Sequence, residues 1–213
     1  MVQTVFITGI GTGIGKTVVS AIIAEALQAD YWKPVQAGYD DGTDSEWMTS
    51  ILTNNKSKVY PEVYRLKLPA SPHLAAKEEG RIISSEKIFS AYSQYVAPGR
   101  RLVIEGAGGL LVPLNDHELV IDLVRKLNAK VILVSRNYLG SINHSLLTAN
   151  LCRQKGIRVM GWIFNDQFMD YEDDIVQWSG YPKLASIGKL GEISPEIISS
   201  EAQKIKDKLL QVF

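Results

Sequence analysis

The sequence predicts an α/β fold with a mostly parallel sheet, helices on both faces of that sheet, and a single domain over residues 1–213. The length fits one such domain, which would bury roughly 70% of its unfolded surface. Short β-branched runs alternate with longer segments of helical period, which is typical of βαβ units on a parallel sheet. The short runs are continuously apolar, as strands covered on both faces by helices should be.

The predicted elements follow one another without an internal repeat or a linker. Strands are expected over residues 4–8, 30–33, 102–105, 131–135, 159–164 and 184–187. Helices are expected over residues 16–29, 44–53, 86–95, 119–127, 141–155, 171–180 and 195–210. Pro61, Pro69 and Pro72 interrupt any long element in residues 54–81, so we expect this less regular segment to be a long excursion between the second and third strands.

Composition and charge exclude several classes of protein. Hydrophobic residues make up 46% and charged residues 22% of the chain, which excludes a disordered, collagenous or membrane-spanning protein. The 23 basic and 23 acidic residues give zero net charge, so we expect neither a nucleic-acid nor a membrane partner. The single cysteine, Cys152, excludes an internal disulfide and favours a cytoplasmic location. No basic residue precedes the apolar N-terminal stretch, so no secretory signal is expected.

A glycine-rich loop is the strongest functional signal: Thr8-Gly-Ile-Gly-Thr-Gly-Ile-Gly-Lys-Thr17 follows a predicted strand and opens a predicted helix. Its glycines let several N–H groups point at one anion, and the helix N-terminus adds partial positive charge. Lys16 supplies a cation and the Thr17 hydroxyl can ligate Mg²⁺. The sequence therefore predicts a P-loop NTPase-like fold that binds the phosphates of a nucleoside triphosphate, in a lengthened variant with five residues between Gly9 and Gly15.

Two other interpretations of this loop fit the sequence less well. A glycine-rich turn without a ligand would not need the Gly-Lys-Thr ending. A dinucleotide fingerprint begins in the same way, but its glycine spacing does not match.

A nucleotide-bound magnesium ion needs carboxylates beside it. Glu105 closes a predicted strand and precedes Gly106-Ala107-Gly108-Gly109, so it should face the crevice at the carboxyl ends of the strands. Asp44 precedes a helical stretch and alone is better explained as an N-cap. Asp40 and Asp41 are rivals that spacing cannot separate from it.

Further blocks of sequence occur together with this loop. Their order and intervals make the chain resemble the dethiobiotin synthetase family over essentially its whole length. The blocks are residues 8–17, Trp32-Lys-Pro-Val-Gln-Ala-Gly38, Ser71-Pro-His73, Glu105-Gly-Ala-Gly-Gly109, Leu139-Gly-Ser-Ile-Asn-His144, Gly161-Trp-Ile-Phe-Asn-Asp166 and Leu190-Gly-Glu-Ile193.

The resemblance implies an ATP-dependent ligase of biotin synthesis with Mg²⁺ as its cofactor. The family converts 7,8-diaminononanoate, CO₂ and ATP into dethiobiotin, ADP and phosphate through a carbamate and a carbamic–phosphoric anhydride. Both reacting groups are anionic, so cations must hold them together in a dry site. The resemblance implies catalytic roles for Lys16, Lys33 and Thr12, and metal-binding roles for Thr17, Asp44 and Glu105.

The resemblance also implies the binding residues. ATP contacts are implied for Gly13, Ile14, Gly15, Lys16, Thr17, Val18, Asp44, Glu105, Gly106, Ala107, Gly108, Asn165, Asp166, Ser194, Pro195 and Glu196. Among these, Asn165 would meet adenine, whose N6 and N7 edge pairs with a carboxamide. Substrate contacts are implied for Thr12, Lys33, Ala37, Leu139, Gly140 and Asn143. The last three would come from a second subunit, which implies a homodimer.

The chain departs from the family pattern at a few positions. The family often has a hydroxyl residue where Ala37 stands and acidic residues at Gly11 and Gly13. It usually has proline at Ser194, whereas here Pro195 follows. A substrate contact at Ala37 would have to come from the backbone.

Two other functions remain open on sequence alone. One is a ParA/MinD-like nucleotide switch of related fold, although such proteins carry an extra lysine early in the loop and residues 9–14 contain none. The other is a P-loop amidoligase or kinase that acts on a different small substrate.

Overall fold

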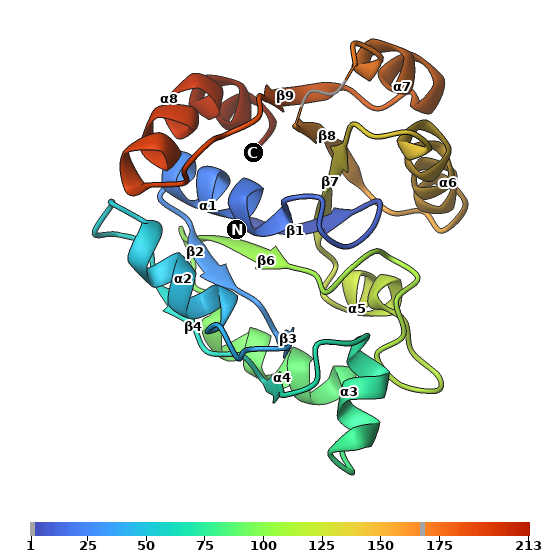
Figure 1. The fold of residues 1–213 in the computed structure, drawn as a ribbon. Helices are drawn as coiled ribbons and strands as arrows, with labels where there is room; N and C mark the ends of the chain where they lie inside the picture. Colours follow the sequence, from blue (N-terminus) through green and yellow to red (C-terminus); the bar gives the residue numbers. More distant parts are fainter. Residues whose placement is uncertain (1–2, 167–168) are drawn as a thin grey trace.

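The structure is a computed structural model that describes residues 3–166 and 169–213. Within these ranges, seven parallel strands form the central sheet in the order β4-β2-β6-β1-β7-β8-β9. Strands β3 and β5 pair in a separate small parallel sheet. The expected parallel sheet between helices is therefore confirmed (Figure 1).

The strands are β1 (Gln3–Gly9), β2 (Asp30–Trp32), β3 (Val35–Ala37), β4 (Val59–Tyr60), β5 (Tyr64–Leu66), β6 (Arg101–Glu105), β7 (Lys130–Arg136), β8 (Val159–Asn165) and β9 (Lys183–Ile187). The helices are α1 (Lys16–Leu27), α2 (Asp44–Ile51), α3 (Pro72–Glu78), α4 (Ser85–Tyr95), α5 (Val120–Lys126), α6 (Ser141–Gln154), α7 (Glu172–Ser179) and α8 (Pro195–Val212).

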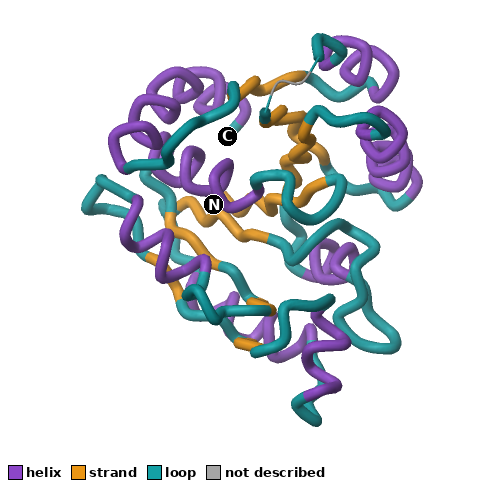
Figure 2. The backbone as a smooth tube through the Cα atoms, in the orientation of Figure 1, coloured by secondary structure: helices purple, strands orange, loops and turns teal. Residues whose placement is uncertain are grey.

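Helices cover both faces of the central sheet, as the purple coils on either side of the orange strands show (Figure 2). Helices α1, α2 and α8 pack on one face over a core that includes Val5 and Ile22. Helices α4, α5, α6 and α7 pack on the other face over a core that includes Phe6 and Leu123. Val5 and Phe6 enter opposite cores because successive side chains of a strand point to opposite faces. This accounts for the continuously apolar strands.

The strand order brings the predicted functional segments together. Strand β6 lies between β2 and β1, and all three run in the same direction. Their carboxyl ends therefore meet at one edge of the sheet, the side where open α/β sheets bind ligands. Lys33 follows β2, Glu105 ends β6, and the glycine-rich loop follows β1. Asn165 ends β8, on the far side of β7 from the loop.

All of the strands and helices predicted from the sequence are present, with ends that differ from the predicted ends by at most two residues. Residues 54–81 hold only the short elements β4, β5 and α3, as expected for a segment that prolines interrupt, although the sequence did not predict these elements individually. Pro61 and Pro69 stand between elements, and Pro72 occupies the first turn of α3, where a missing N–H costs nothing. The prolines therefore mark element boundaries.

Candidate active site

A cleft of about 720 Å³ opens at the carboxyl ends of β1, β2 and β6. The glycine-rich loop, the start of α2, the segment after β6 and residues 69–72 line it. Most of the predicted site residues lie here. Those that line the cleft are Thr12, Gly13, Gly15, Lys16, Thr17, Val18, Lys33, Ala37, Asp44, Glu105, Gly106, Ala107 and Gly108.

The conformation of the glycine-rich loop depends on the backbone of Gly15 and on a contact from the end of β8. Gly15 is the N-cap of α1 with φ of 87°, a left-handed conformation that favours glycine. A Cβ atom at Gly15 would lie 1.9 Å from the Nδ2 atom of Asn165. That Nδ2 atom donates to the Ile14 carbonyl at 3.0 Å, so the end of β8 fixes the loop. The predicted Ile14 contact is thus available only through its backbone, because its side chain is buried.

Lys16 curls back over the loop, and its Nζ atom donates to the Gly11 carbonyl at 2.7 Å. Burial lowers the pKa of Lys16 from 10.5 to about 8, with Glu105 acting in the opposite direction. The side chain therefore carries a charge near neutral pH that is poorly solvated. An anion in the loop would relieve that cost.

Glu105 is 1% exposed and shares its two oxygens among three donors. Its Oε1 atom accepts from the Thr17 hydroxyl at 2.9 Å and from Lys33 Nζ at 3.2 Å. Its Oε2 atom accepts from the Tyr31 hydroxyl at 2.9 Å. Burial, together with the charge of Glu105, raises the pKa of Tyr31 well above its usual value, so the phenol is a donor. A buried carboxylate needs hydrogen-bond donors of this kind to offset the loss of its hydration.

Lys33 forms ion pairs with both Asp44 and Glu105. Although burial acts to lower it, the two neighbouring carboxylates raise the pKa of Lys33 above its usual value. Lys33 is therefore an ammonium ion at neutral pH and does not act as a base. Two ammonium and two carboxylate groups, counting Lys16, balance one another in the cleft.

Asp44 is placed by the start of α2. The N-cap is Thr43, whose side chain accepts from the Glu46 N–H in a reciprocal capping box, so the N-cap interpretation of Asp44 is wrong. Asp44 is the first helical residue and its carboxylate points to Lys33. The rivals Asp40 and Asp41 are exposed and do not line the cleft in the described parts of the chain.

The residues predicted to hold magnesium fit such an ion. The Thr17 hydroxyl and the Glu105 carboxylate are in direct contact, and Lys33 links Glu105 to Asp44. Hydroxyl and carboxylate oxygens are the hard donors that Mg²⁺ prefers. Over residues 3–166 and 169–213, no group of three or more His, Cys, Asp or Glu side chains is arranged to hold a metal.

A second hollow, of about 210 Å³, lies across the loop from the cleft. Asn165 and Asp166, both predicted to contact ATP, line it together with Leu190 and Ile193. Arg136 also lines it, donates to Gly13 O at 3.4 Å and pairs with Asp166 at 2.7 Å. Sequence reasoning missed Arg136. No local signal marks it, because Arg136 reaches the loop only through the position of β7 between β1 and β8.

Ser194, Pro195 and Glu196 form the start of α8 and do not line this hollow within the described parts of the chain. The Ser194 side chain accepts from the Ile197 N–H at 3.4 Å as the helix N-cap. It also donates to Glu196 at 2.7 Å. Their neighbour Ile193 lines the hollow instead.

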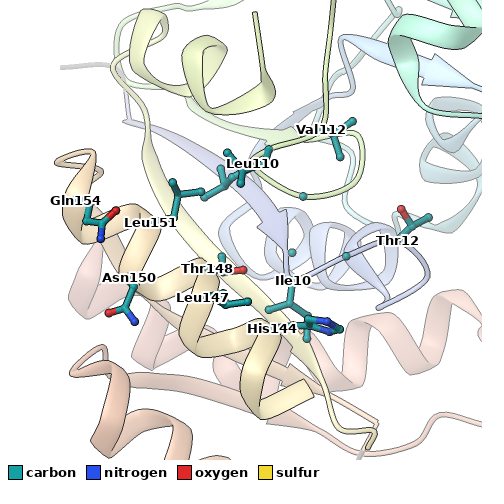
Figure 3. Close-up of a pocket in the computed structure, with 14 residues that line it drawn as sticks. Ile10, Thr12, Leu110, Val112, His144, Leu147, Thr148, Asn150, Leu151 and Gln154 are labelled. Atoms are coloured by element: carbon teal, nitrogen blue, oxygen red, sulfur yellow. The ribbon is translucent and has the colours of Figure 1, made fainter. Parts of the chain in front are cut away.

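The predicted substrate residues on the β7–α6 segment do not line the cleft within the described parts of the chain. Leu139 is 96% exposed, and Gly140 and Asn143 are exposed at the start of α6. A groove of about 520 Å³ runs beside them, between α6 and the glycine-rich loop (Figure 3). It is largely apolar, and it meets the cleft at Thr12 and Val112, which line both.

Comparison with known proteins gives a matching family model and similar sequences that extend over most of the chain. Residues 3–197 match a protein family described as an AAA domain. The chain is 46% identical over 203 residues to the ATP-dependent dethiobiotin synthetase BioD of Cytophaga hutchinsonii. The alignment covers 95% of this chain and 96% of that protein.

Across residues 3–166 and 169–213, every helix is too short or too polar to cross a membrane.

Solved structures confirm the P-loop ATPase fold. The cell division ATPase MinD of Pyrococcus furiosus superposes with a TM-score of 0.69 at 13% identity, covering 100% of both chains. The septum site-determining protein MinD of Pyrococcus horikoshii OT3, complexed with Mg-ADP, gives a TM-score of 0.59 at 16% identity. That match covers 100% of this chain and 93% of the other. At such identities the likeness shows the fold alone.

Proposed function

The chain belongs to the family of ATP-dependent dethiobiotin synthetases, and from that premise we propose that it closes the ureido ring of dethiobiotin from 7,8-diaminononanoate, CO₂ and ATP. The observation that carries the proposal is the convergence of Lys16, Thr17, Lys33, Asp44 and Glu105 in one cleft beside the glycine-rich loop. These residues supply the charges that bind a triphosphate and a second anion facing it.

The chemistry needs three bond-forming steps. One substrate amine bonds to the carbon of CO₂ and loses a proton, which gives a carbamate. A carbamate oxygen then attacks the γ-phosphorus, the bond to the bridging oxygen breaks, and ADP leaves. The second amine attacks the carbonyl carbon of the resulting anhydride and loses its proton, and phosphate leaves as the ring closes.

The protein's part is to bring two anions together and hold them. Lys16 and the N–H groups of the loop would bind the β- and γ-phosphates, as the start of a helix does for anions. Lys33, with its raised pKa, would present an ammonium ion to the carbamate, and the Thr12 hydroxyl at the cleft edge would donate to it. Positioning and charge therefore supply most of the acceleration.

Mg²⁺ would be held by Thr17, Asp44 and Glu105 together with phosphate oxygens, and it would neutralise charge that develops on the γ-phosphate. Support comes from the hard oxygen donors of the cleft. It also comes from a protein of the same fold whose structure contains Mg-ADP. Lys33 contacts both Asp44 and Glu105, so its ammonium group would lie close to a metal ion bound by these two carboxylates.

The adenine would lie in the hollow lined by Asn165 and Asp166. Asn165 donates from Nδ2 to the loop, which leaves its Oδ1 atom to accept from an adenine amino group. Backbone groups of Gly106, Ala107 and Gly108 are close enough to the loop to reach the phosphate side of the nucleotide. The roles of Ser194, Pro195 and Glu196 would need the start of α8 to move toward the base.

The substrate tail would reach Leu139, Gly140 and Asn143 of a second copy of the chain, which makes the active form a homodimer. Support comes from the exposure of these residues and from their position outside the cleft of their own chain. We further propose that residues 1–213 act as one ligase domain in the cytoplasm. Strands from both halves of the sequence share one sheet, which supports a single domain.

A nucleotide switch of the ParA/MinD type is not favoured. The structural likeness to MinD proteins is at 13–16% identity, and residues 9–14 contain no lysine. The sequence relatives that cover the whole chain are synthetases. A kinase or another amidoligase is less consistent with the same relatives.

The test uses purified protein with 7,8-diaminononanoate, isotopically labelled bicarbonate and Mg-ATP. ADP release that depends on the diamine, together with a labelled ureido carbonyl detected by mass spectrometry, would support the proposal. ADP release without labelled product would contradict it. Stimulation of hydrolysis by DNA or lipid vesicles alone would favour the nucleotide switch.

A further inference from the structure

A hydrogen bond from Tyr31 to Glu105 links a buried residue of β2 to the carboxylate in the cleft. Tyr31 lies on β2 and is fully buried, and its hydroxyl donates to Glu105 Oε2 at 2.9 Å. It does not line the cleft among the described residues. It therefore acts on whatever the cleft binds only through Glu105.

The sheet register explains how the two side chains meet. Tyr31 is opposite Val103 on β6, so Glu105 is the next residue of β6 on the same face. Tyr31 and Val103 share the core beneath α1, and Thr17 lies in the first turn of that helix. Tyr31 thus holds the carboxylate from below, while Thr17 and Lys33 contact it from the cleft.

The two carboxylate oxygens of Glu105 therefore have different partners. Oε2 is occupied by a donor that no ligand can reach, whereas Oε1 faces the Thr17 hydroxyl and the Lys33 ammonium. Without the Tyr31 hydroxyl, only the Oε1 contacts with Thr17 and Lys33 would restrain the carboxylate about its last torsion, which is a soft one. Partners that orient a ligand in this way strongly affect metal affinity.

We propose that Tyr31 is a positioning residue that fixes Glu105 with Oε1 directed at the metal and nucleotide site. The inference rests on the proposed function, because that function supplies the metal and the nucleotide. It assigns no chemical step to Tyr31.

The test measures metal binding separately from turnover. Mn²⁺ is titrated by electron paramagnetic resonance in the presence of ADP, and ADP binding without metal is measured by calorimetry. Tyr31→Phe removes one oxygen and keeps the ring. It should weaken Mn²⁺ binding about tenfold and leave metal-free ADP binding within about twofold of the wild type. A purely structural role would instead lower both affinities by the same factor, and that result would overturn the inference.

Two comparisons sharpen the result. Tyr60→Phe is the matched control, since the Tyr60 hydroxyl also donates to a carboxylate, Asp30 at 3.4 Å, but outside the cleft. It should leave Mn²⁺ binding unchanged. In a Glu105→Gln background, Tyr31→Phe should have no further effect on Mn²⁺ binding, because the group it positions is gone. A full tenfold loss in that background would also overturn the inference.

A second variant keeps the test decisive if Tyr31→Phe does not melt cooperatively. Para-aminophenylalanine at position 31 keeps the ring and a donor, and it should bind Mn²⁺ within about threefold of the wild type. A loss of about tenfold or more in this variant, despite its donor, would overturn the inference. If the wild type itself fails to bind Mn²⁺ with ADP, the proposed function falls and the inference falls with it. Wild-type binding with an unaffected Tyr31→Phe variant overturns only the inference.

Discussion

The two ends of the proposed nucleotide site are built in different ways. At the phosphate end, Lys16, Lys33 and Glu105 are buried, and each has a hydrogen-bond or ion-pair partner within the protein. At the base end, Arg136 is exposed and Asn165 and Asp166 are half-buried. There the Arg136–Asp166 ion pair joins the ends of β7 and β8, and Arg136 also donates to the Gly13 carbonyl of the loop.

This difference between the two ends indicates which end should contribute more of the free energy of nucleotide binding. Charges at the phosphate end act in a low dielectric and are worth more per contact than charges at the surface. An exposed ion pair contributes little, roughly 0 to 1 kcal/mol. We therefore expect changes at the phosphate end to abolish function and changes at the base end to tune it.

The largest effect is expected for Lys16→Ala and Lys33→Ala. Each removes a cation that would stabilise the charge developing between carbamate and γ-phosphate, so kcat should fall on the order of a thousandfold. Diamine-dependent ADP release measures kcat, and thermal melting separates this loss from unfolding. Lys33→Ala also leaves two carboxylates unpaired in the cleft, so its melting temperature should fall too.

Lys183→Ala is the matched control for this pair of variants. Lys183 also bridges two carboxylates, Glu172 at 3.5 Å and Asp173 at 2.5 Å, but outside the cleft. Its loss should leave kcat unchanged. Near-normal turnover in Lys33→Ala would contradict the role proposed for this residue.

The pH dependence of nucleotide binding tests the phosphate end without a large loss of function. Lys16 has a lowered pKa of about 8 in the free protein, and a bound phosphate favours its charged form. ADP affinity should therefore be highest below about pH 8 and weaken as the pH rises above it, by at most about tenfold per pH unit. Calorimetry in buffers of different ionisation enthalpy should detect proton uptake on binding above pH 8.

The same shift has the opposite consequence for the stability of the free protein. The folded-state pKa of Lys16 lies below the unfolded value of 10.5, so folding disfavours the ammonium form. That penalty is present in full below about pH 8 and fades as the pH rises toward 10.5. Lys16→Met should remove both pH effects. Persistence of the affinity change in this variant would assign it to another group.

Arg136→Ala tests the base end and should have a smaller effect. The variant removes an exposed ion pair to Asp166 and a contact to Gly13, so ADP affinity should fall about fivefold or less. Binding of inorganic tripolyphosphate, which has no base, should not change. Calorimetry with both ligands gives the comparison, and an equal loss for tripolyphosphate would show that Arg136 acts on the phosphate loop.

The same contrast explains what could be predicted from the sequence. The phosphate loop is contiguous, and Lys33 and Glu105 are recognisable as strand-end residues, so the rule for parallel sheets brings them together. The Tyr31–Glu105 contact depends on β2 lying beside β6 in a particular register, which no local pattern reveals. Arg136 belongs to the base end only because β7 separates β1 from β8. Side chains from separate segments can be assembled only when the strand order is known.

The smallest effect on function is expected for Ser194→Ala, which also decides between two interpretations of Ser194. The resemblance to the family implies that Ser194 contacts the nucleotide, whereas the structure makes it the N-cap of α8, accepting from Ile197 N–H. An N-cap role predicts a loss of about 1 kcal/mol in the free energy of unfolding, because one helix-end donor loses its partner. It also predicts that ADP affinity does not change.

Urea unfolding and calorimetry measure the two quantities on the same sample. Ser84→Ala is a useful control, since the Ser84 side chain accepts from the Lys87 N–H as the N-cap of α4, outside the cleft and the hollow, so it should lose similar stability and leave ADP affinity unchanged. A fall in ADP affinity without a loss of stability would show that the start of α8 moves to the base when nucleotide binds. The base end would then be assembled by its ligand, whereas the side chains of the phosphate end are held by partners within the protein.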